Sequence, residues 1–281
     1  MTGSSGFIGR ALVARLRKDL FQVTELSSSS GDIAEPATLR QFVDQTYDHV
    51  FHLAGRTYVP DSWNDPLGFQ RVNVLGTANV LEYCRIHGVQ LTFISAYLYG
   101  VPERLPVSEA CATRPNNPYA LSKHLAEQIC AFYAGYYGLA VTVVRPFNIF
   151  GPGQKPHFLI PQIVNQVRAR QVIRIKDLSP RRDYIYIDDV VDALIKTLDA
   201  PKGYNVFNIG SGSSLSVREL IAAIQSVAGT ELPVVSEGEI RPNEIDDVYA
   251  DIEKARSILN WVPGITFKQG IEKMVFEESC L

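Results

Sequence analysis

The chain has few of the residues that build metal sites or disulfides. Its 281 residues include four cysteines, five histidines, two methionines and two tryptophans. The cysteines form no CxxC pair, and no cysteine and histidine stand together at the spacing of metal ligands. We therefore expect no metal centre and expect the cysteines to be reduced, buried thiols. They are Cys84, Cys111, Cys130 and Cys280.

Long apolar runs and an excess of one charge are also missing. The sequence shows no run of about 18 apolar residues and no signal peptide. A net charge of -3 disfavours nucleic acid or an anionic membrane as the main partner. With 46% hydrophobic and 20% charged residues, the chain can bury a large core. We expect a cytoplasmic protein whose partner is a small molecule.

A glycine-rich segment opens the chain. Residues Thr2 to Gly9 have the sequence TGSSGFIG, a GxxGxxG pattern, and an apolar-periodic helix follows over Ala11–Leu20. Glycine allows close approach of a pyrophosphate, whose charge is stabilised by the free N–H groups of a helix start. The pattern favours dinucleotide binding, although an ordinary glycine-rich turn has the same appearance.

Tyr119 and Lys123 stand four residues apart and share one face of a predicted helix. A cation beside a phenol favours phenolate and lowers the pKa of the phenol toward neutrality, where it both gives and takes a proton. The alternative is a Tyr and a Lys on a solvated face. Ser95 ends an apolar strand, where it is positioned to bond a substrate oxygen or simply to cap a turn.

Strands and helices alternate along the chain, which predicts an α/β fold with a doubly wound parallel sheet. The predicted strands are Gln22–Leu26, His49–Leu53, Leu91–Ile94, Val141–Arg145 and Val206–Ile209. The predicted helices are Gly9–Leu20, Ala37–Gln45, Pro66–His87, Pro118–Tyr137 and Asp188–Asp199.

Taken together, these residues resemble the extended short-chain dehydrogenase/reductases, in particular the NAD-dependent epimerase/dehydratase family that acts on nucleotide sugars. The resemblance covers nearly the whole chain. It rests on Thr2 to Gly9, Asp32-Ile33, His52 to Gly55, Asn73 to Thr77, Ser95 with Tyr99-Gly100, Tyr119 with Lys123, Arg145 to Pro152, Arg182 to Val190, Asn208 to Gly212, Arg241 to Glu244 and Trp261 to Pro263.

The resemblance implies a Rossmann-type NAD(P)-binding domain over residues 1–150, to which 188–210 return, and a smaller substrate-binding region over 151–281. It implies that Ser95, Tyr119 and Lys123 are catalytic, with Lys123 also holding the nicotinamide ribose. The implied cofactor contacts are Gly3, Gly6, Phe7, Ile8, Gly9, Ser27, Asp32, Ile33, Leu53, Ala54, Gly55 and Asn73, with Tyr119 and Lys123. The implied substrate contacts are Ser95, Ala96, Tyr97, Asn148, Arg182 and Arg241.

The cofactor is expected to be NAD or NADP, with NADP slightly favoured. NAD sites often place a carboxylate about 20 residues after the glycines, on the ribose hydroxyl. Here that position falls in the run Ser27 to Ser30, which has no acid and whose hydroxyls can bond a 2′-phosphate. Asp32 matches the acid that contacts adenine in the family.

The residues after Ser95 bear on the reaction. Dehydratases of the family carry an Asp-Glu pair there, whereas this chain has Ala96 and Tyr97, so dehydration is disfavoured. We expect reduction of a nucleotide 4-keto-6-deoxyhexose at C4, with 4-epimerisation on retained NAD as the alternative. A third possibility is an inactive NAD(P)H-binding sensor, which keeping both Tyr119 and Lys123 disfavours.

The resemblance also implies a homodimer formed through a four-helix interface. One helix of each pair carries Tyr119 and the other runs through Asn73. Apolar residues at Leu121, Leu125, Ile129 and Phe132 fit such an interface.

One feature departs from the family. Its first strand supplies several apolar residues before the TG dipeptide, whereas here only Met1 precedes Thr2. A central strand that is missing leaves ladder groups unpaired, so we expect native residues to be absent before Met1.

Overall fold

A parallel sheet forms the centre of the computed structural model, which describes residues 1–238 and 244–276. Its strand order is β1, β2, β3, β8, and every neighbouring pair is parallel. The strands are β1 (His49–His52), β2 (Gln90–Ile94), β3 (Val141–Pro146) and β8 (Tyr204–Ile209). The predicted α/β class is confirmed, and so are four of the five predicted strands.

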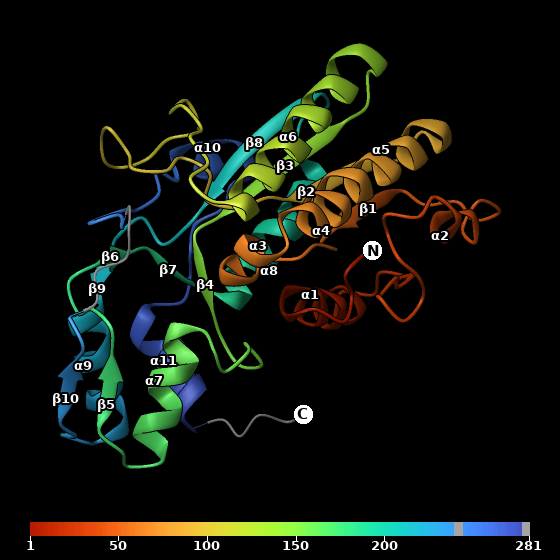
Figure 1. Cartoon of the computed structure of the whole chain (residues 1–281). Helices are drawn as coiled ribbons and strands as arrows, with labels where there is room; N and C mark the ends of the chain where they lie inside the picture. The colour runs from red at the N-terminus through yellow and green to blue at the C-terminus, as the bar shows by residue number, and fades with distance from the viewer. Residues whose placement is uncertain (239–243, 277–281) are drawn as a thin grey trace.

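Helices cover the sheet on both sides (Figure 1). Helices α5 (Gly76–His87) and α6 (Pro118–Tyr137) pack against each other, and α1 (Phe7–Lys18) packs against α8 (Ile187–Lys196). Shorter helices in the N-terminal half of the chain are α2 (Ala37–Arg40), α3 (Val59–Asn64) and α4 (Pro66–Gln70). Strands β1, β2 and β3 are buried along most of their length because they are covered from both faces, and β8 is buried over its second half, Phe207 to Ile209.

The predicted strand over Gln22–Leu26 is wrong: only Leu26 pairs, through a single bridge to Thr2, and Thr2 also bridges His52. The Met1 amine donates to Thr24 O (2.7 Å), and Leu26 N donates to Met1 O (2.8 Å). A ladder needs a partner along its whole length, and Met1 to Gly3 reach only the end of this segment.

Two predicted helices differ in detail from the structure. Residues 37–45 form α2 and then a run of tight turns with i to i+3 bonds such as Phe42 N to Leu39 O. The long helix predicted from Pro66 to His87 is interrupted by a π-helical turn, Arg71–Leu75, between α4 and α5. This turn inserts one extra residue into the helix, a device that recurs at functional sites.

The C-terminal half is a smaller group of helices and two-stranded sheets, most of which lies at the lower left of Figure 1, whereas its helix Glu253–Leu259 contacts β8 at the upper left. The strand pairs are β4 (Asn148–Phe150) with β7 (Tyr184–Tyr186), β5 (Ile173–Ile175) with β10 (Val234–Ser236), and β6 (Arg181–Arg182) with β9 (Leu215–Ser216). The helices are α7 (Leu159–Arg168), α9 (Val217–Ala228), α10 (Glu253–Leu259) and α11 (Phe267–Phe276).

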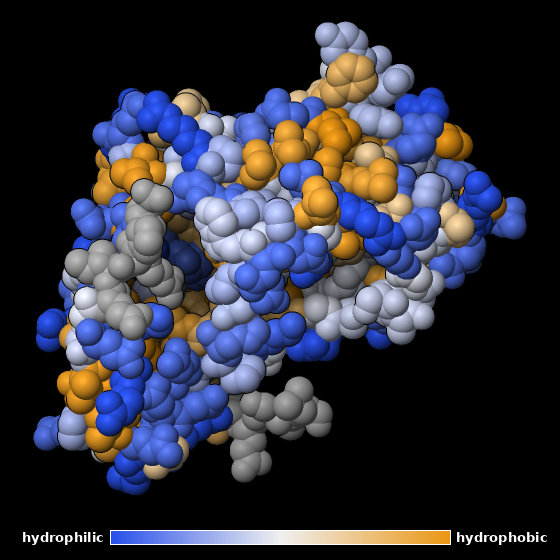
Figure 2. Space-filling view, viewed as in Figure 1, coloured by the Kyte–Doolittle hydropathy of each residue, from blue (hydrophilic) through white to orange (hydrophobic). Residues whose placement is uncertain are grey.

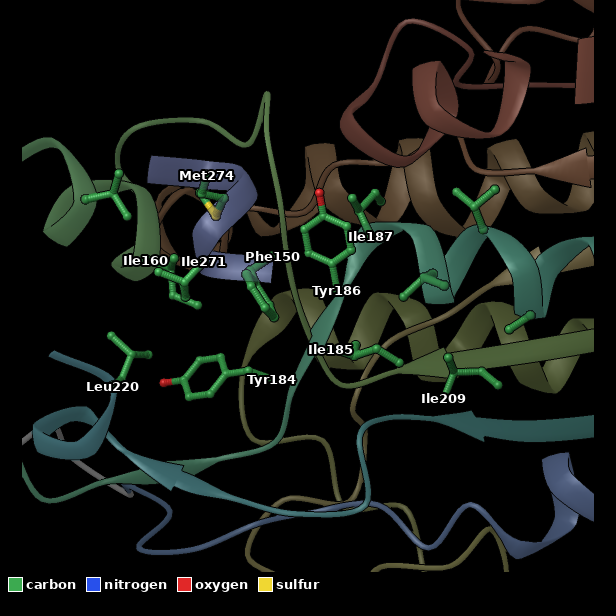
Figure 3. Close-up of a cluster of buried hydrophobic side chains, with 14 of the residues drawn as sticks. Phe150, Ile160, Tyr184, Ile185, Tyr186, Ile187, Ile209, Leu220, Ile271 and Met274 are labelled. Carbon is green, nitrogen blue, oxygen red and sulfur yellow. The ribbon is translucent and has the colours of Figure 1, made fainter. Parts of the chain in front are cut away.

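One hydrophobic cluster joins the two halves. It runs from Leu12 of α1 and Val144 of β3 to Phe150, Ile160 and Ile271. Figure 3 shows Phe150 close to Ile160 and Ile271, so β4, α7 and α11 share this core. Apolar burial of this extent fixes the C-terminal half against the sheet. Figure 2 shows the surface hollowed between the two halves.

Candidate active site

The glycine loop packs directly on the end of β1. Gly3 has a φ of +72°, and a Cβ placed on it would lie 2.6 Å from Ala54 N. A Cβ on Gly9 would lie 2.1 Å from Gly3 O, so α1 also approaches the loop too closely for any side chain there. Within the described residues no side chain caps α1 at Gly6, and its first turn has no acid. The loop therefore offers a helix start suited to a phosphate.

Asn73, on the π-helical turn, holds the segment after β1. Its Oδ1 accepts from Arg56 N (2.8 Å), and its Nδ2 donates to Arg56 O (3.0 Å) and to Ser122 Oγ (2.9 Å). A Cβ on Gly55 would lie 3.0 Å from Asn73 Oδ1 and 3.4 Å from Lys123 Nζ. The glycine, the asparagine and the lysine thus meet at one point at the carboxyl edge of the sheet.

Tyr119 and Lys123 lie in the first turns of α6. Asn117 caps this helix by accepting from Ala120 N (2.8 Å), and Pro118 follows at the first position. Lys123 is 2% exposed; its Nζ donates to Ile94 O (2.8 Å) and lies 4.5 Å from the centre of the Phe93 ring. The Tyr119 ring meets Phe69 edge-on at 6.3 Å.

Burial opposes the effect that Lys123 is expected to have on the phenol. Burial raises the pKa of Tyr119 above its ordinary value, and burial lowers the pKa of Lys123 to about 8. The lysine ammonium donates to the Ile94 carbonyl, and desolvation of the buried phenol is what raises the pKa of Tyr119. The prediction of a phenol shifted toward neutrality is wrong.

Ser95 follows β2 directly. Its backbone N–H donates to Val144 O (2.7 Å), which fixes the residue at the end of the sheet. Its side chain is 3% exposed, and none of the described residues gives Oγ a hydrogen-bond partner. A buried hydroxyl without a partner costs free energy, so this atom is suited to bond an oxygen of a ligand.

Beside Asp32, which is expected to contact adenine, the structure adds a residue that the sequence did not indicate. Asp32 accepts from Ala34 N (2.9 Å) and from Arg71 Nη1 (2.5 Å), and Arg71 also bonds Glu35. The Ala34 N–H and the Arg71 guanidinium lower the pKa of Asp32. Arg71 comes from the π-helical turn, which no periodicity in the sequence predicts.

The residues that neighbour Asp32 in the sequence have different environments. Ile33 is buried, and its Cγ2 lies 2.7 Å from where a Cβ on Gly76 would be. Ser27 to Ser30 form an exposed turn in which Ser30 N donates to Ser27 O (2.9 Å) and the Ser27 and Ser29 hydroxyls lie 2.6 Å apart. This turn follows Leu26, whose carbonyl accepts from Gly3 N, so it lies next to the glycine loop.

Three of the other predicted substrate residues, Tyr97, Asn148 and Arg182, already have polar partners within the chain. Tyr97 donates to Gly100 O (2.6 Å) and packs on Tyr99 and Phe147, and Ala96 is buried. Asn148 is exposed and donates to Asp183 O (3.0 Å). Arg182 pairs with Glu244 and donates to Ile245 O. Arg241 lies outside the described residues.

A buried polar network connects α6 to the sheet behind this site. Arg145 of β3 pairs with Glu127 at 2.5 Å and donates to Tyr99 Oη (2.8 Å), which donates to Asn208 Oδ1 (2.6 Å). Glu127 stands one helical turn after Lys123. The motifs containing Arg145 and Asn208 were evident in the sequence, but their pairing was not, because it joins strands 63 residues apart in the chain.

Comparison with known proteins identifies the family. The sequence profile of the NAD dependent epimerase/dehydratase family matches residues 1–210. The chain belongs to this family. It is thus an NAD(P)-dependent enzyme of the short-chain dehydrogenase/reductase type, as the motifs predicted.

Members of the family that resemble the chain include a reductase and an epimerase. GDP-6-deoxy-D-mannose reductase of Pseudomonas aeruginosa is 33% identical, with 98% of this chain and 95% of that protein covered. UDP-glucose 4-epimerase of Mycolicibacterium smegmatis is 32% identical, with 98% and 96% covered. The structure of RMD from Pseudomonas aeruginosa complexed with NADPH has a TM-score of 0.88 and 32% identity, with 97% and 95% covered. The Rossmann-type fold is therefore confirmed.

No described helix is long and apolar enough to cross a membrane. Among the described residues, no three or more His, Cys, Asp or Glu side chains gather where they could hold a metal ion.

Proposed function

We propose that the protein reduces a nucleotide 4-keto-6-deoxyhexose at C4 with NADPH. The observation that carries the proposal is the unpaired, buried Ser95 hydroxyl. It stands next to Ile94, whose carbonyl holds the Lys123 ammonium. Similarity to a GDP-6-deoxy-D-mannose reductase and to a structure complexed with NADPH supports reduction. Ala96 and Tyr97 support it further, because neither is an acid or base for dehydration.

The chain's own residues have distinct roles in this reaction. The bound nicotinamide supplies a hydride to the sugar carbon. Tyr119 gives a proton to the attached oxygen, and Ser95 donates a hydrogen bond to the same oxygen and polarises the carbonyl. Lys123 lies beside Gly55 and Asn73, where its ammonium would hold the ribose of a bound nicotinamide and would lower the free energy of the Tyr119 phenolate.

We propose that residues 1–150 and 188–210 hold the cofactor and that residues 151–281 hold the substrate. The glycine loop binds the pyrophosphate, with Gly3, Gly6 and Gly9 allowing the approach and the N–H groups of Phe7 and Ile8 facing it. Ser27 to Ser30 favour NADP because their exposed hydroxyls can bond a 2′-phosphate. Asp32, Ile33, Leu53 and Ala54 line the adenosine side.

On the substrate side, Asn148, Arg182 and Arg241 are proposed to bind the diphosphate of the nucleotide sugar. A guanidinium suits a diphosphate because it offers several donors in one plane. Arg182 is paired with Glu244 in the structure, so substrate binding requires the diphosphate to compete with this carboxylate.

The protein is further proposed to be a homodimer through α5 and α6. Apolar side chains gather on the face of the molecule where these helices lie (Figure 2). Phe132 is 49% exposed, and Leu121 and Leu125 of the same helix are also exposed. Patches of this kind commonly form subunit interfaces.

The alternative is a nucleotide-sugar 4-epimerase with retained NAD, which similarity to UDP-glucose 4-epimerase supports. Incubation with a panel of nucleotide 4-keto-6-deoxyhexoses and nucleotide hexoses separates the two. Stoichiometric loss of NADPH absorbance with a keto sugar supports the reductase, whereas interconversion of two hexoses without net oxidation supports the epimerase. Tyr119→Phe is the control: it should bind NADPH and lose about 10²- to 10⁴-fold in rate. A sensor would show neither reaction in wild type.

A further inference from the structure

A chain of side-chain hydrogen bonds runs through the interior from the glycine loop to α6. The five links are Thr2 Oγ1 to His52 Nδ1 (2.7 Å), His52 Nε2 to Thr77 Oγ1 (3.0 Å), Thr77 Oγ1 to Asn73 O (2.6 Å), Asn73 Nδ2 to Ser122 Oγ (2.9 Å), and Ser122 Oγ to Tyr119 O (2.7 Å).

The direction of this chain follows from the number of protons available. The Thr77 hydroxyl donates its one proton to Asn73 O, so it must accept from His52 Nε2–H. The neutral imidazole then has a bare Nδ1, which accepts from the Thr2 hydroxyl. Thr2 Oγ1 in turn accepts from Ala54 N (3.2 Å). One tautomer of His52 therefore satisfies every link, and the other does not.

Every side chain in the series is buried. His52, Thr77 and Ser122 are 0% exposed, Asn73 is 1% and Thr2 is 4%. A buried donor or acceptor that loses its partner costs its full desolvation free energy, so a satisfied buried network holds one arrangement strongly. Burial also lowers the pKa of His52 to about 3, which keeps the ring neutral in ordinary assay conditions.

The two ends of the chain reach the two halves of the proposed reaction centre. At one end, Thr2 precedes Gly3, and its hydroxyl fixes the Ala54 N–H against which the glycine loop packs. At the other end, Ser122 stands between Tyr119 and Lys123 on α6. Asn73 is the junction, because the π-helical turn presents both its carbonyl to Thr77 and its side chain to Ser122 and Arg56.

We propose that His52 and Thr77 are positioning residues that set the spacing between the phosphate-binding loop and the helix bearing Tyr119 and Lys123. Neither is placed to touch the substrate, and both act through Thr2 and Asn73. The inference rests on the proposed cofactor-dependent reduction, whose failure would be evident in wild type before any variant is compared.

The test removes one hydrogen bond of the series near one of its ends and measures the effect at the other end. Thr77→Val removes the hydroxyl next to Asn73 and is read on the Kd of NADPH, measured by nicotinamide fluorescence without substrate. Thr2→Val removes the hydroxyl at the loop and is read on kcat at saturating NADPH and keto sugar. Thr77→Ser and Thr2→Ser restore the hydroxyls. Thr92→Val is the matched control. Thr92 is equally buried, and it bonds His49 and Thr197, which do not belong to this series of hydrogen bonds.

We expect Thr77→Val to raise the Kd about tenfold and Thr2→Val to lower kcat about tenfold, which corresponds to the loss of one buried hydrogen bond. The serine variants should stay within about threefold of wild type. Thr92→Val should lower the melting temperature about as much as Thr77→Val and Thr2→Val do, because it also removes one buried hydroxyl. It should leave Kd and kcat within about twofold of wild type. If Thr77→Val and Thr2→Val change only the melting temperature, as the control does, the residues are merely structural and the inference is overturned. Should Thr77→Val fail to fold, the Thr2→Val and Thr2→Ser pair decides the question on kcat.

Discussion

The ammonium of Lys123 donates a 2.8 Å hydrogen bond to the carbonyl oxygen of Ile94, the last residue of β2. The charge is therefore held at the end of the sheet before any cofactor arrives. Holding it there is unfavourable, because burial lowers the pKa of Lys123 from 10.5 to about 8.

Lys123→Met should stabilise the cofactor-free protein while abolishing turnover. The pKa change of Lys123 corresponds to about 3 kcal/mol at pH 7, and the lost bond to Ile94 offsets about 1 kcal/mol. We expect the free energy of unfolding to rise by about 2 kcal/mol in urea titrations.

The sign of this effect can be checked with pH. The penalty is fully present below pH 8, where the folded lysine is charged, and it fades as pH rises from 8 to 10.5. The advantage of Lys123→Met should shrink across that window. A variant less stable than wild type at pH 7 would contradict the prediction.

The buried His52 and the partly buried His49 should make the fold sensitive to acid. Burial lowers the pKa of His49 to about 4 and that of His52 to about 3, from 6.5. Because the unfolded state binds the proton first, stability falls as pH drops below 6.5, by about 2 kcal/mol per histidine at pH 5. His49→Gln should therefore lose about 2 kcal/mol less than wild type between pH 7 and pH 5 in urea titrations. Equal losses would show that His49 does not contribute.

Breaking the Glu127–Arg145 pair should destabilise the protein strongly. The Glu127 side chain is 1% exposed and that of Arg145 is 8%, so Glu127→Gln leaves a buried guanidinium without its counterion and costs about 3–5 kcal/mol. The exposed pair Glu253 and Arg256 supplies the control, and Glu253→Gln should cost less than about 1 kcal/mol. Comparable losses for the two variants would contradict the proposed burial of the charge. Denaturant titration of both measures the difference.

Two helical glycines should respond oppositely to alanine. A Cβ at Gly9 would lie 2.1 Å from Gly3 O, whereas a Cβ at Gly135 of α6 meets nothing within 4 Å. Gly9→Ala should displace the glycine loop and weaken NADPH binding at least tenfold, about 1.4 kcal/mol or more. Gly135→Ala should stabilise α6 by up to about 1 kcal/mol. Fluorescence titration with NADPH and thermal unfolding measure the two effects, and unchanged NADPH affinity in Gly9→Ala would contradict the tight packing.

Local patterns were enough to predict the fold class and the candidate residues. The alternation of strands and helices gave the sheet, and the spacing of Tyr119 and Lys123 placed both on α6. What the patterns missed depends on contacts between distant segments. The bond from Lys123 to Ile94 spans 29 residues, and the burial that raises the pKa of Tyr119 comes from tertiary packing that the four-residue spacing does not describe.

The π-helical turn is a second case. Hydrophobic periodicity does not resolve a single extra residue in a helix, so one continuous helix was predicted and the position of Arg71 beside Asp32 was missed. The strand expected before Leu26 failed for another reason. Its partner is only the short segment from Met1 to Gly3, and pairing depends on both members.

Asp183 joins the C-terminal half to the end of the sheet. Its buried carboxylate accepts from Ser211 N, Ser211 Oγ, Gly212 N and Ala250 N, and its carbonyl accepts from Asn148. The segments that supply these donors are far apart in the chain, and Ala250 is made 67 residues after Asp183. During synthesis on the ribosome, the sheet of residues 1–210 can therefore close early, but the hydrogen bonds around the Asp183 carboxylate are complete only once Ala250 has emerged. A nascent chain stopped before that point should capture NADPH and yet fail to discriminate between sugars.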